Sequence, residues 1–142
     1  RKPETNVRTH REAARLVAAH WPGEIVWHGF EVGNVLITGS QLKRTPRSNP
    51  VRRAYELRQH AGRASIEGGQ PSYDQAAALF AVRGAEPDLW QVVSGGRVEI
   101  DAEGVSTWTP DASARHAYVK IAGEPRRLAG VIEALMVAGP AK

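Results

Sequence analysis

The sequence predicts an α/β fold in which helices alternate with short strands and a β-hairpin lies near the C-terminus. An amphipathic helical pattern after Thr9 is followed directly by the β-prone run 24–32, and a helix followed by a strand is half of an α/β unit. Two further β-prone runs, 97–100 and 105–108, are joined by a short turn that ends in Gly104. Because glycine readily adopts the positive φ of a tight turn, these two runs predict a hairpin.

The composition is typical of a globular protein. With 142 residues, 42% of them hydrophobic and 24% charged, the chain is long enough for one domain with its own core. No apolar run is long enough to span a membrane, and no apolar segment of a signal peptide follows the basic N-terminal residues. We therefore expect a cytoplasmic protein with no membrane partner. The absence of Cys excludes disulfides, thiolate metal sites and cysteine nucleophiles.

Two capping boxes mark predicted helix starts. Thr9 with Glu12, and Ser72 with Gln75, have the spacing in which two side chains satisfy backbone N–H groups at the start of a helix. The helix after Ser72 is expected to continue to Val82, since its apolar residues recur at helical spacing.

Proline and glycine divide the central part of the chain. A short helix is expected at 35–43, and Pro50, in the favoured first-turn position, predicts a longer helix that Ala61 and Gly62 end. Residues 62–71 are rich in glycine and polar groups, so they predict an exposed loop.

The C-terminal part contains a third predicted strand at 117–121 and then the most regular helix of the sequence. Pro125 opens this helix and Gly139 with Pro140 closes it. Its apolar stripe predicts that one face packs on the core. The stripe consists of Leu128, Val131, Ile132, Leu135 and Met136.

Glu4 and Asn6 are a candidate sugar-binding pair. In an extended segment, side chains two positions apart point to the same side. A carboxylate beside an amide can both accept and donate hydrogen bonds with sugar hydroxyls. The alternative is a frayed chain terminus.

Asp74 is a candidate metal ligand. It falls in the first turn of the helix that follows Ser72, where the helix dipole stabilises a carboxylate, and it comes after a glycine-containing loop. An ionised aspartate at this place suits a hard cation. The alternative is an ordinary aspartate at a helix start.

Positive charge gathers between residues 43 and 63, where the only acid is Glu56. Such a cluster is a hypothetical site for phosphate or nucleic acid, and the alternative is a solvated loop and outer helix face. Its members are Lys43, Arg44, Arg47, Arg52, Arg53, Arg58 and Arg63. Among the five histidines no pair has zinc-site spacing, so His28, at the end of a predicted strand, is expected to be structural.

Several segments, in their order and spacing, resemble the inosine/uridine-preferring nucleoside hydrolase family. Glu4-Thr5-Asn6 is similar to the E-F-N segment of that family, and the others are similar to blocks of a bacterial branch. The segments are 4–14, 25–33, 49–55, 72–82, 95–101 and the hairpin around Trp108. The resemblance implies the C-terminal portion of the open-sheet nucleoside hydrolase fold, with residues 1–142 as the C-terminal part of a single domain whose N-terminal part is absent.

The resemblance also implies an activity. Members of this family hydrolyse the N-glycosidic bond of ribonucleosides, with a calcium ion that binds the ribose hydroxyls and a water from which an aspartate removes a proton. It implies that Glu4 and Asn6 bind ribose and that Asp74 is a calcium ligand. Tyr73 stands where many members have a histidine that helps to protonate the leaving base. A phenol, with an unperturbed pKa of about 10, is a weaker acid there, which puts purine-nucleoside activity in doubt.

The chain departs from the family in lacking the N-terminal D-x-D-x-x-x-D-D cluster, which supplies the general base and further calcium ligands. Asp74 alone cannot hold Ca²⁺, which takes roughly six to eight oxygen ligands. We therefore expect an intact nucleoside hydrolase in which the absent N-terminal part, or a second copy in a homo-oligomer, completes the site, and an isolated chain that is inactive. The expected partner is a nucleoside and not nucleic acid. The alternatives are a non-catalytic ribosyl- or sugar-binding module and a basic nucleic-acid-binding domain.

Overall fold

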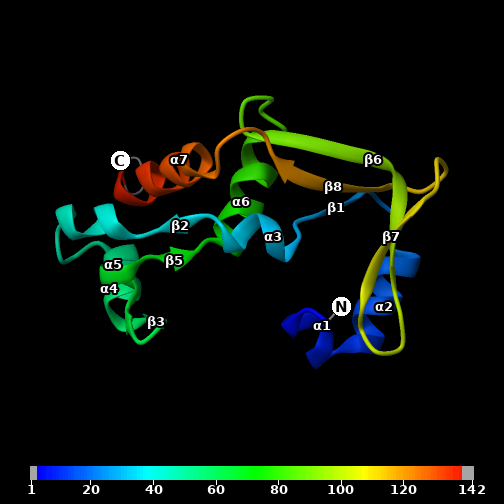
Figure 1. Ribbon diagram of the computed structural model, residues 1–142, viewed down its shortest axis with the longest axis horizontal. Coiled ribbons are helices and arrows are strands. Elements are labelled where there is room, and N and C mark those ends of the chain that lie inside the picture. Colours follow the sequence, from blue (N-terminus) through cyan, green and yellow to red (C-terminus); the bar gives the residue numbers. More distant parts are fainter. Residues whose placement is uncertain (1–2, 139–142) are drawn as a thin grey trace. The chain divides into compact units, whose positions relative to one another are not determined.

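The computed structural model describes residues 3–138 and confirms the mixed α/β class (Figure 1). The chain folds into two compact units. Unit 1 contains the described residues up to 27 together with 92–120, and unit 2 contains 28–91 and the described residues from 121 onward. The sheets of the described part are open, and none closes into a barrel. No helix within this part is long and apolar enough to cross a membrane.

A four-stranded mixed sheet, most of which belongs to unit 1, has the strand order β1-β8-β6-β7. β1 (Ile25–Trp27) runs parallel to β8 (His116–Ile121), and β6 (Trp90–Ile100) runs antiparallel to β7 (Ser106–Pro110). The predicted strand at 117–121 is therefore confirmed. It runs parallel to β1, which lies far earlier in the chain, because a parallel pair requires a long crossover connection.

The predicted hairpin between β6 and β7 is also confirmed. Gly104 adopts a φ of +86°, as the turn requires. The Asp101 carboxylate accepts a hydrogen bond from the N–H of Val105 at 2.8 Å, which fixes the turn from within. On β7, the Trp108 ring lies edge-on to Tyr118 of β8, with 4.8 Å between ring centroids.

Two helices, α1 (Thr5–Thr9) and α2 (Arg11–His20), precede the sheet in unit 1. The capping box predicted at Thr9 and Glu12 is wrong. His10 is the N-cap of α2 and makes no side-chain cap bond, whereas the Thr9 hydroxyl donates to a carbonyl one turn earlier in α1, at 2.9 Å. The Thr9 hydroxyl therefore bonds a nearby backbone carbonyl and does not cap α2.

The strand predicted at 24–32 is correct only in its first half. β1 ends at Trp27, and α3 (Phe30–Asn34) begins after Gly29, which is an extended N-cap. A short apolar run does not distinguish a strand from a short buried helix, because both bury most of their side chains.

The helix predicted at 35–43 is wrong. The chain instead forms β2 (Ile37–Thr38) and then the 3₁₀ helix η1 (Ser40–Arg44). Gly39, between them, has a φ of +120°, which no residue of an α-helix adopts. A Cβ atom at this position would lie 2.5 Å from the ring of Tyr55, so the close approach also requires glycine.

α4 (Pro50–Leu57) begins as predicted. The Asn49 side chain is its N-cap and accepts hydrogen bonds from two first-turn N–H groups, at 2.8 and 3.1 Å. The helix ends earlier than predicted, at Leu57, because Ala61 and Gly62 with φ of +50° and +77° turn a hairpin instead of ending a helix.

Residues 62–71 form ordered elements, so the prediction of an exposed loop is wrong. β3 (Gln59–His60) and β4 (Arg63–Ala64) make the hairpin, α5 (Ser65–Gly68) follows, and β5 (Gln70–Pro71) pairs antiparallel with β2. The loop prediction fails because the start of α5 is buried in the core of unit 2.

The two long helices of unit 2, α6 (Tyr73–Arg83) and α7 (Pro125–Ala138), confirm the helical periodicity of the sequence. In α7 the stripe residues Leu128 and Ile132 are buried, as predicted, whereas Leu135 of the same stripe is 45% exposed. The predicted stop of α7 at Gly139–Pro140 lies outside the described residues.

The core of unit 2 gathers side chains from several elements. Leu42, Tyr55 and Ile66 form its buried cluster, and Met136 and Val137 of α7 pack against them. Each buried methylene contributes roughly 0.8 kcal/mol, so α7 helps to hold η1, α4 and α5 together.

Glu133 fixes α7 to the start of η1. One of its carboxylate oxygens accepts hydrogen bonds from the N–H groups of Gly39 and Gln41, both at 2.8 Å, and from the Ser40 hydroxyl at 3.3 Å. Hydrogen bonds to a charged acceptor are stronger than neutral ones. They also satisfy N–H groups at a helix start that have no partner within the helix.

His28, in unit 2, lies among aromatic rings, in agreement with the structural role expected for it. Its imidazole is edge-on to Phe80 at 5.3 Å and to Trp90 at 5.5 Å between centroids. Its buried Nδ1 has no hydrogen-bond partner among residues 3–138. Burial lowers the pKa of His28 below its usual value, because the charged form loses hydration without gaining a partner.

Acid should therefore destabilise unit 2 through His28. The unfolded state binds the proton more readily than the folded state, so the free energy of unfolding is greatest above about pH 6.5, falls as the pH decreases below it, and levels off below the folded-state pKa. His28→Phe should remove this component. His60→Phe, at an exposed position of β3, should retain it. Urea unfolding at several pH values measures the effect, and equal pH dependence in the wild type and His28→Phe would contradict it.

Candidate functional site

The start of α6 carries the predicted metal ligand. Asp74 lies in the first turn of α6, as predicted, and its side chain is exposed. Within residues 3–138 its carboxylate takes part in no hydrogen bond or ion pair. The carboxylate is thus open to a ligand from outside the described chain.

The capping box predicted around this helix start is wrong. Ser72 is the N-cap of α6, but its side chain makes no cap bond. Its buried hydroxyl lies 2.7 Å from the Thr38 hydroxyl, and the amide of Gln75 donates to the Tyr55 hydroxyl at 3.2 Å. Both residues of the predicted box are therefore bonded to distant parts of unit 2.

Tyr73, the residue before Asp74, belongs to an aromatic pair. The rings of Phe30 and Tyr73 have centroids 5.7 Å apart and are inclined by 31°, and the Tyr73 hydroxyl donates to Asn34 Oδ1 at 3.1 Å. Phe30 is 60% exposed and Tyr73 36%. We call Phe30, Asn34, Tyr73 and Asp74 the α3–α6 platform. Sequence reasoning missed Phe30 and Asn34 because it assigned the first to a strand and no structure to the second.

Gly33 brings α3 close to α6. A Cβ atom on Gly33 would lie 2.6 Å from the Cα atom of Tyr73 and would also collide with its ring. The carbonyl of Gly33 accepts a hydrogen bond from the N–H of Ser72 at 3.2 Å. Only glycine allows this approach, so the geometry of the platform depends on it.

Glu4 and Asn6 have a different geometry from the one predicted. The segment is not extended, because α1 begins at Thr5 and Glu4 is its N-cap. One oxygen of the Glu4 carboxylate accepts from the N–H groups of Asn6 and Val7, at 2.8 and 3.2 Å. Both side chains are exposed. They belong to unit 1, whereas Tyr73 and Asp74 belong to unit 2.

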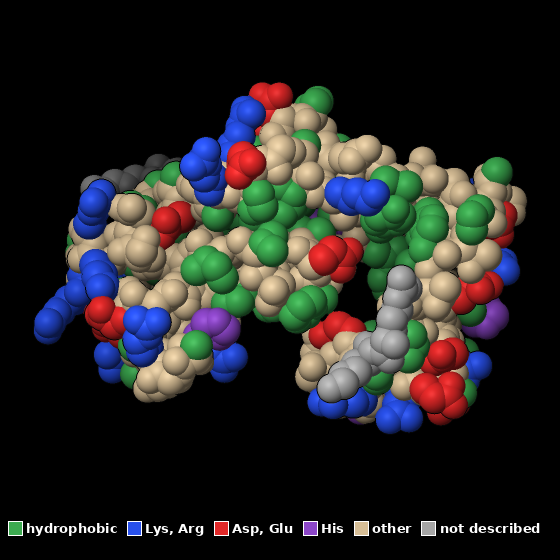
Figure 2. All heavy atoms as spheres, in the orientation of Figure 1, with side chains coloured by type: hydrophobic (Ala, Val, Ile, Leu, Met, Phe, Trp, Pro, Cys, Tyr) green, Lys and Arg blue, Asp and Glu red, His purple; other side chains and the backbone are tan. Residues whose placement is uncertain are grey.

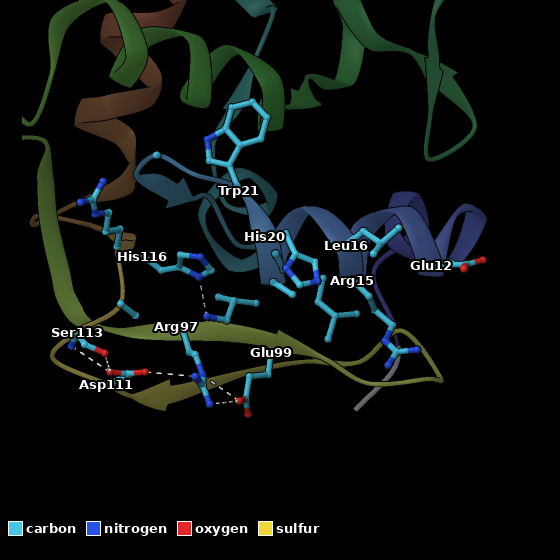
Figure 3. Close-up of a pocket in the computed structure, with 17 residues that line it drawn as sticks. Glu12, Arg15, Leu16, His20, Trp21, Arg97, Glu99, Asp111, Ser113 and His116 are labelled. Atoms are coloured by element: carbon cyan, nitrogen blue, oxygen red, sulfur yellow. Dashed lines mark hydrogen bonds and ion pairs between the residues drawn. The ribbon is translucent and has the colours of Figure 1, made fainter.

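Unit 1 also contains a groove of about 740 Å³ between α2 and the β6–β7 hairpin (Figure 3). Its hairpin side carries an ion-pair network. The Arg97 guanidinium contacts Glu99 at 2.8 Å and Asp111 at 3.3 Å, and the Ser113 hydroxyl donates to Asp111 at 2.6 Å. The hydrogen bond from Ser113 is the main reason that the pKa of Asp111 lies below its usual value, and Arg97 adds to the effect.

The described groups of the groove do not form a serine–histidine–aspartate triad. Ser113 donates to a carboxylate instead of a histidine, and the buried His116 accepts a hydrogen bond from the N–H of Val98 through Nδ1, at 3.0 Å. In a hydrolytic triad a histidine within hydrogen-bond reach takes the proton of the serine hydroxyl. The groove therefore has a polar, largely self-paired lining, and not the arrangement of a hydrolytic triad.

The described chain does not form a calcium cage. Within residues 3–138 no three His, Cys, Asp or Glu side chains gather as a metal site. Asp74 can supply one oxygen ligand, and Asn34 Oδ1 is already engaged by Tyr73. The residues present therefore do not fit a complete calcium site.

The basic cluster around η1 and α4 is partly neutralised. Lys43 pairs with Glu67 at 2.6 Å, and Arg52 and Arg53 pair with Glu56 at 2.9 and 3.4 Å. The hydrogen bond from Arg52 is the main reason that the pKa of Glu56 lies below its usual value. Figure 2 shows mostly Lys and Arg side chains, with a few acidic ones among them, over this part of unit 2. This mixed surface favours the solvated-face alternative.

Comparisons with known proteins identify no relative. No family model matches the chain, and neither the curated proteins nor the solved structures contain a significant match. The resemblance to nucleoside hydrolases therefore rests on the sequence segments alone.

Gly33→Ala should displace Tyr73 from the α3–α6 platform. The added methyl has no room between α3 and the Tyr73 backbone, so we expect unit 2 to lose about 1–3 kcal/mol of unfolding free energy, as in other overpacked sites. Gly130→Ala is the matched control, since a Cβ there meets open space in α7 and should be neutral or stabilising. Urea unfolding and the NMR shifts of the Tyr73 ring measure both. An unchanged Tyr73 environment in Gly33→Ala would contradict the packing.

Proposed function

We propose that this chain belongs to a longer protein that hydrolyses the N-glycosidic bond of nucleosides, and that the α3–α6 platform is its contribution to the site. One observation carries the proposal. The exposed carboxylate of Asp74, which pairs with no side chain within residues 3–138, lies at a helix start one residue after Tyr73, whose ring packs on that of Phe30. This combination provides an anionic oxygen ligand next to an aromatic surface, which a ribosyl group with an attached base requires.

The aromatic pair suits a nucleobase. Stacking of a base on an aromatic side chain contributes about 1–3 kcal/mol and tolerates different bases. The Asn34 amide adds two N–H donors beside Tyr73, while its oxygen accepts from the phenol. Phe30 and Tyr73 would provide stacking, and Asn34 would provide a polar contact to the edge of the base.

Tyr73 is better placed to stack on a nucleobase than to protonate it. Its hydroxyl proton is directed at Asn34 Oδ1, so it would have to leave that acceptor before it could reach a leaving base. The sequence-based assignment of Tyr73 as the group that protonates the leaving base therefore becomes the weaker part of the proposal. The proton is better supplied by solvent or by a group outside this chain.

Hydrolysis requires more groups than this chain holds. Water attacks the anomeric carbon, the C–N bond breaks, and its electron pair goes to the base nitrogen, which then takes up a proton. The carboxylate that accepts the water proton and the other oxygen ligands of Ca²⁺ must come from the rest of the protein or from a second copy. Glu4 and Asn6 belong to unit 1, so the proposal for the α3–α6 platform of unit 2 does not depend on them.

The second candidate is a ribosyl-binding module without turnover. The engaged hydroxyl of Tyr73 favours it, because a platform that binds the base without protonating it needs no acid. Release of free base by the intact protein distinguishes the two candidates, since a binding module retains the nucleoside unchanged.

Asp74→Asn in the intact protein should lower nucleoside hydrolysis on the order of 100-fold. Loss of even a supporting partner of a metal ligand costs roughly 10–100-fold, and an amide is a weaker ligand than a carboxylate. Asp88→Asn is the control, because this exposed carboxylate pairs only with Arg127 in the described chain. Residues 1–142 alone, given calcium and a panel of nucleosides, should release no base. Turnover by the chain alone, or an unchanged rate in Asp74→Asn, would contradict the proposal.

A further inference from the structure

A buried network of hydroxyl groups lies directly behind the α3–α6 platform. The Thr38 hydroxyl is 2.7 Å from that of Ser72 and 3.0 Å from that of Tyr55, and Gln75 donates to Tyr55 at 3.2 Å. Thr38 is 2% exposed and Ser72 is fully buried. The network therefore lies inside unit 2, where each unpaired polar group would be costly.

The protons of this network can be assigned from its geometry. Gln75 must donate to Tyr55, because an amide nitrogen accepts no hydrogen bond. Thr38 donates to the sulfur of Met136 at 3.9 Å. Ser72 and Tyr55 then both donate to Thr38 Oγ1, whose two lone pairs accept them. Every hydroxyl proton has an acceptor in this arrangement, and Thr38 is its centre.

Local structure explains why a threonine occupies this position. β2 pairs with β5 in the register Thr38 to Gln70 and Ile37 to Pro71. Side chains alternate along a strand, so Ile37 is exposed while Thr38 is buried. The following residue, Gly39, starts the turn into η1 and leaves room for the Tyr55 ring.

The network holds the platform from both sides. Ser72 immediately precedes Tyr73 and Asp74, and Gln75 immediately follows them. The N–H of Ser72 also donates to the carbonyls of Gly33 and Leu36, at 3.2 and 3.0 Å. Tyr73 and Asp74 are therefore exposed residues between two neighbours that the network holds in place.

We infer that Thr38 is a positioning residue for the platform: its hydroxyl fixes the first turn of α6 and thereby the direction of the Tyr73 ring and the Asp74 carboxylate toward a nucleoside. The inference rests on the proposed function for the identity of the ligand. The effect of Thr38 on the geometry of the platform concerns only unit 2, so this effect and the proposed function are tested separately.

The test compares Thr38→Val, which keeps the shape and removes the hydroxyl, with Thr38→Ser, which keeps the hydroxyl. NMR spectra of the full chain report the contact between the Phe30 and Tyr73 rings. We expect Thr38→Val to lose this contact and to shift the Tyr73 and Asp74 amides, and Thr38→Ser to retain both. Thr45→Val is the matched control, since Thr45 is buried in the same unit but donates only to the Leu42 carbonyl.

If Thr38→Val does not fold, Ser72→Ala removes one bond of the network and serves as the second variant. A wild-type ring contact and wild-type amide shifts in either folded variant would overturn the inference. In the intact protein, Thr38→Val should lower kcat/KM for nucleosides about tenfold, with recovery in Thr38→Ser. Absence of hydrolysis in the wild type would overturn the proposed function alone, because the ring contact is measured without substrate.

Discussion

The hydroxyl of Thr38 is the interaction on which the rest of unit 2 depends. It joins β2 to Ser72 before α6, to Tyr55 of α4 and to Met136 of α7. Buried hydroxyls that lack an acceptor destabilise a fold by about 1–3 kcal/mol each. The Thr38 side chain, which accepts hydrogen bonds from two hydroxyls, therefore links α4, α6 and α7 to β2. The platform at the start of α6 is ordered because its neighbours belong to this network.

The sequence predicted the elements whose signals are local and missed those whose partners are distant. The periodic stripe of α7, the Asn49–Pro50 start of α4 and the Gly104 hairpin were predicted because neighbouring residues determine them. The capping box at Ser72 and Gln75 failed since both side chains bond residues far away in the chain. Competition between a local cap and a buried acceptor cannot be read from spacing alone.

In the candidate site, too, features with local signals were predicted and those with distant partners were missed. Asp74 was predicted at the start of α6 and lies there, exposed and unpaired within the described chain. Phe30 was not recognised as a partner of Tyr73, because a strand through residues 24–32 would have placed it elsewhere. Glu4 was expected to be free for sugar, but it caps α1, since a helix start needs an acceptor for its N–H groups. The nucleoside hydrolase assignment remains a proposal that these contacts support at the platform.

Amide hydrogen exchange at Ser72 tests whether the buried hydroxyl network anchors the start of α6. The N–H of Ser72 donates to two carbonyls of the α3 region, and its side chain is fully buried in the hydroxyl network. If the network anchors the start of α6, this amide exchanges as slowly as that of Leu79 in the middle of α6, through global unfolding of unit 2. Rapid exchange, typical of the frayed start of an ordinary helix, would show that the network does not anchor the platform.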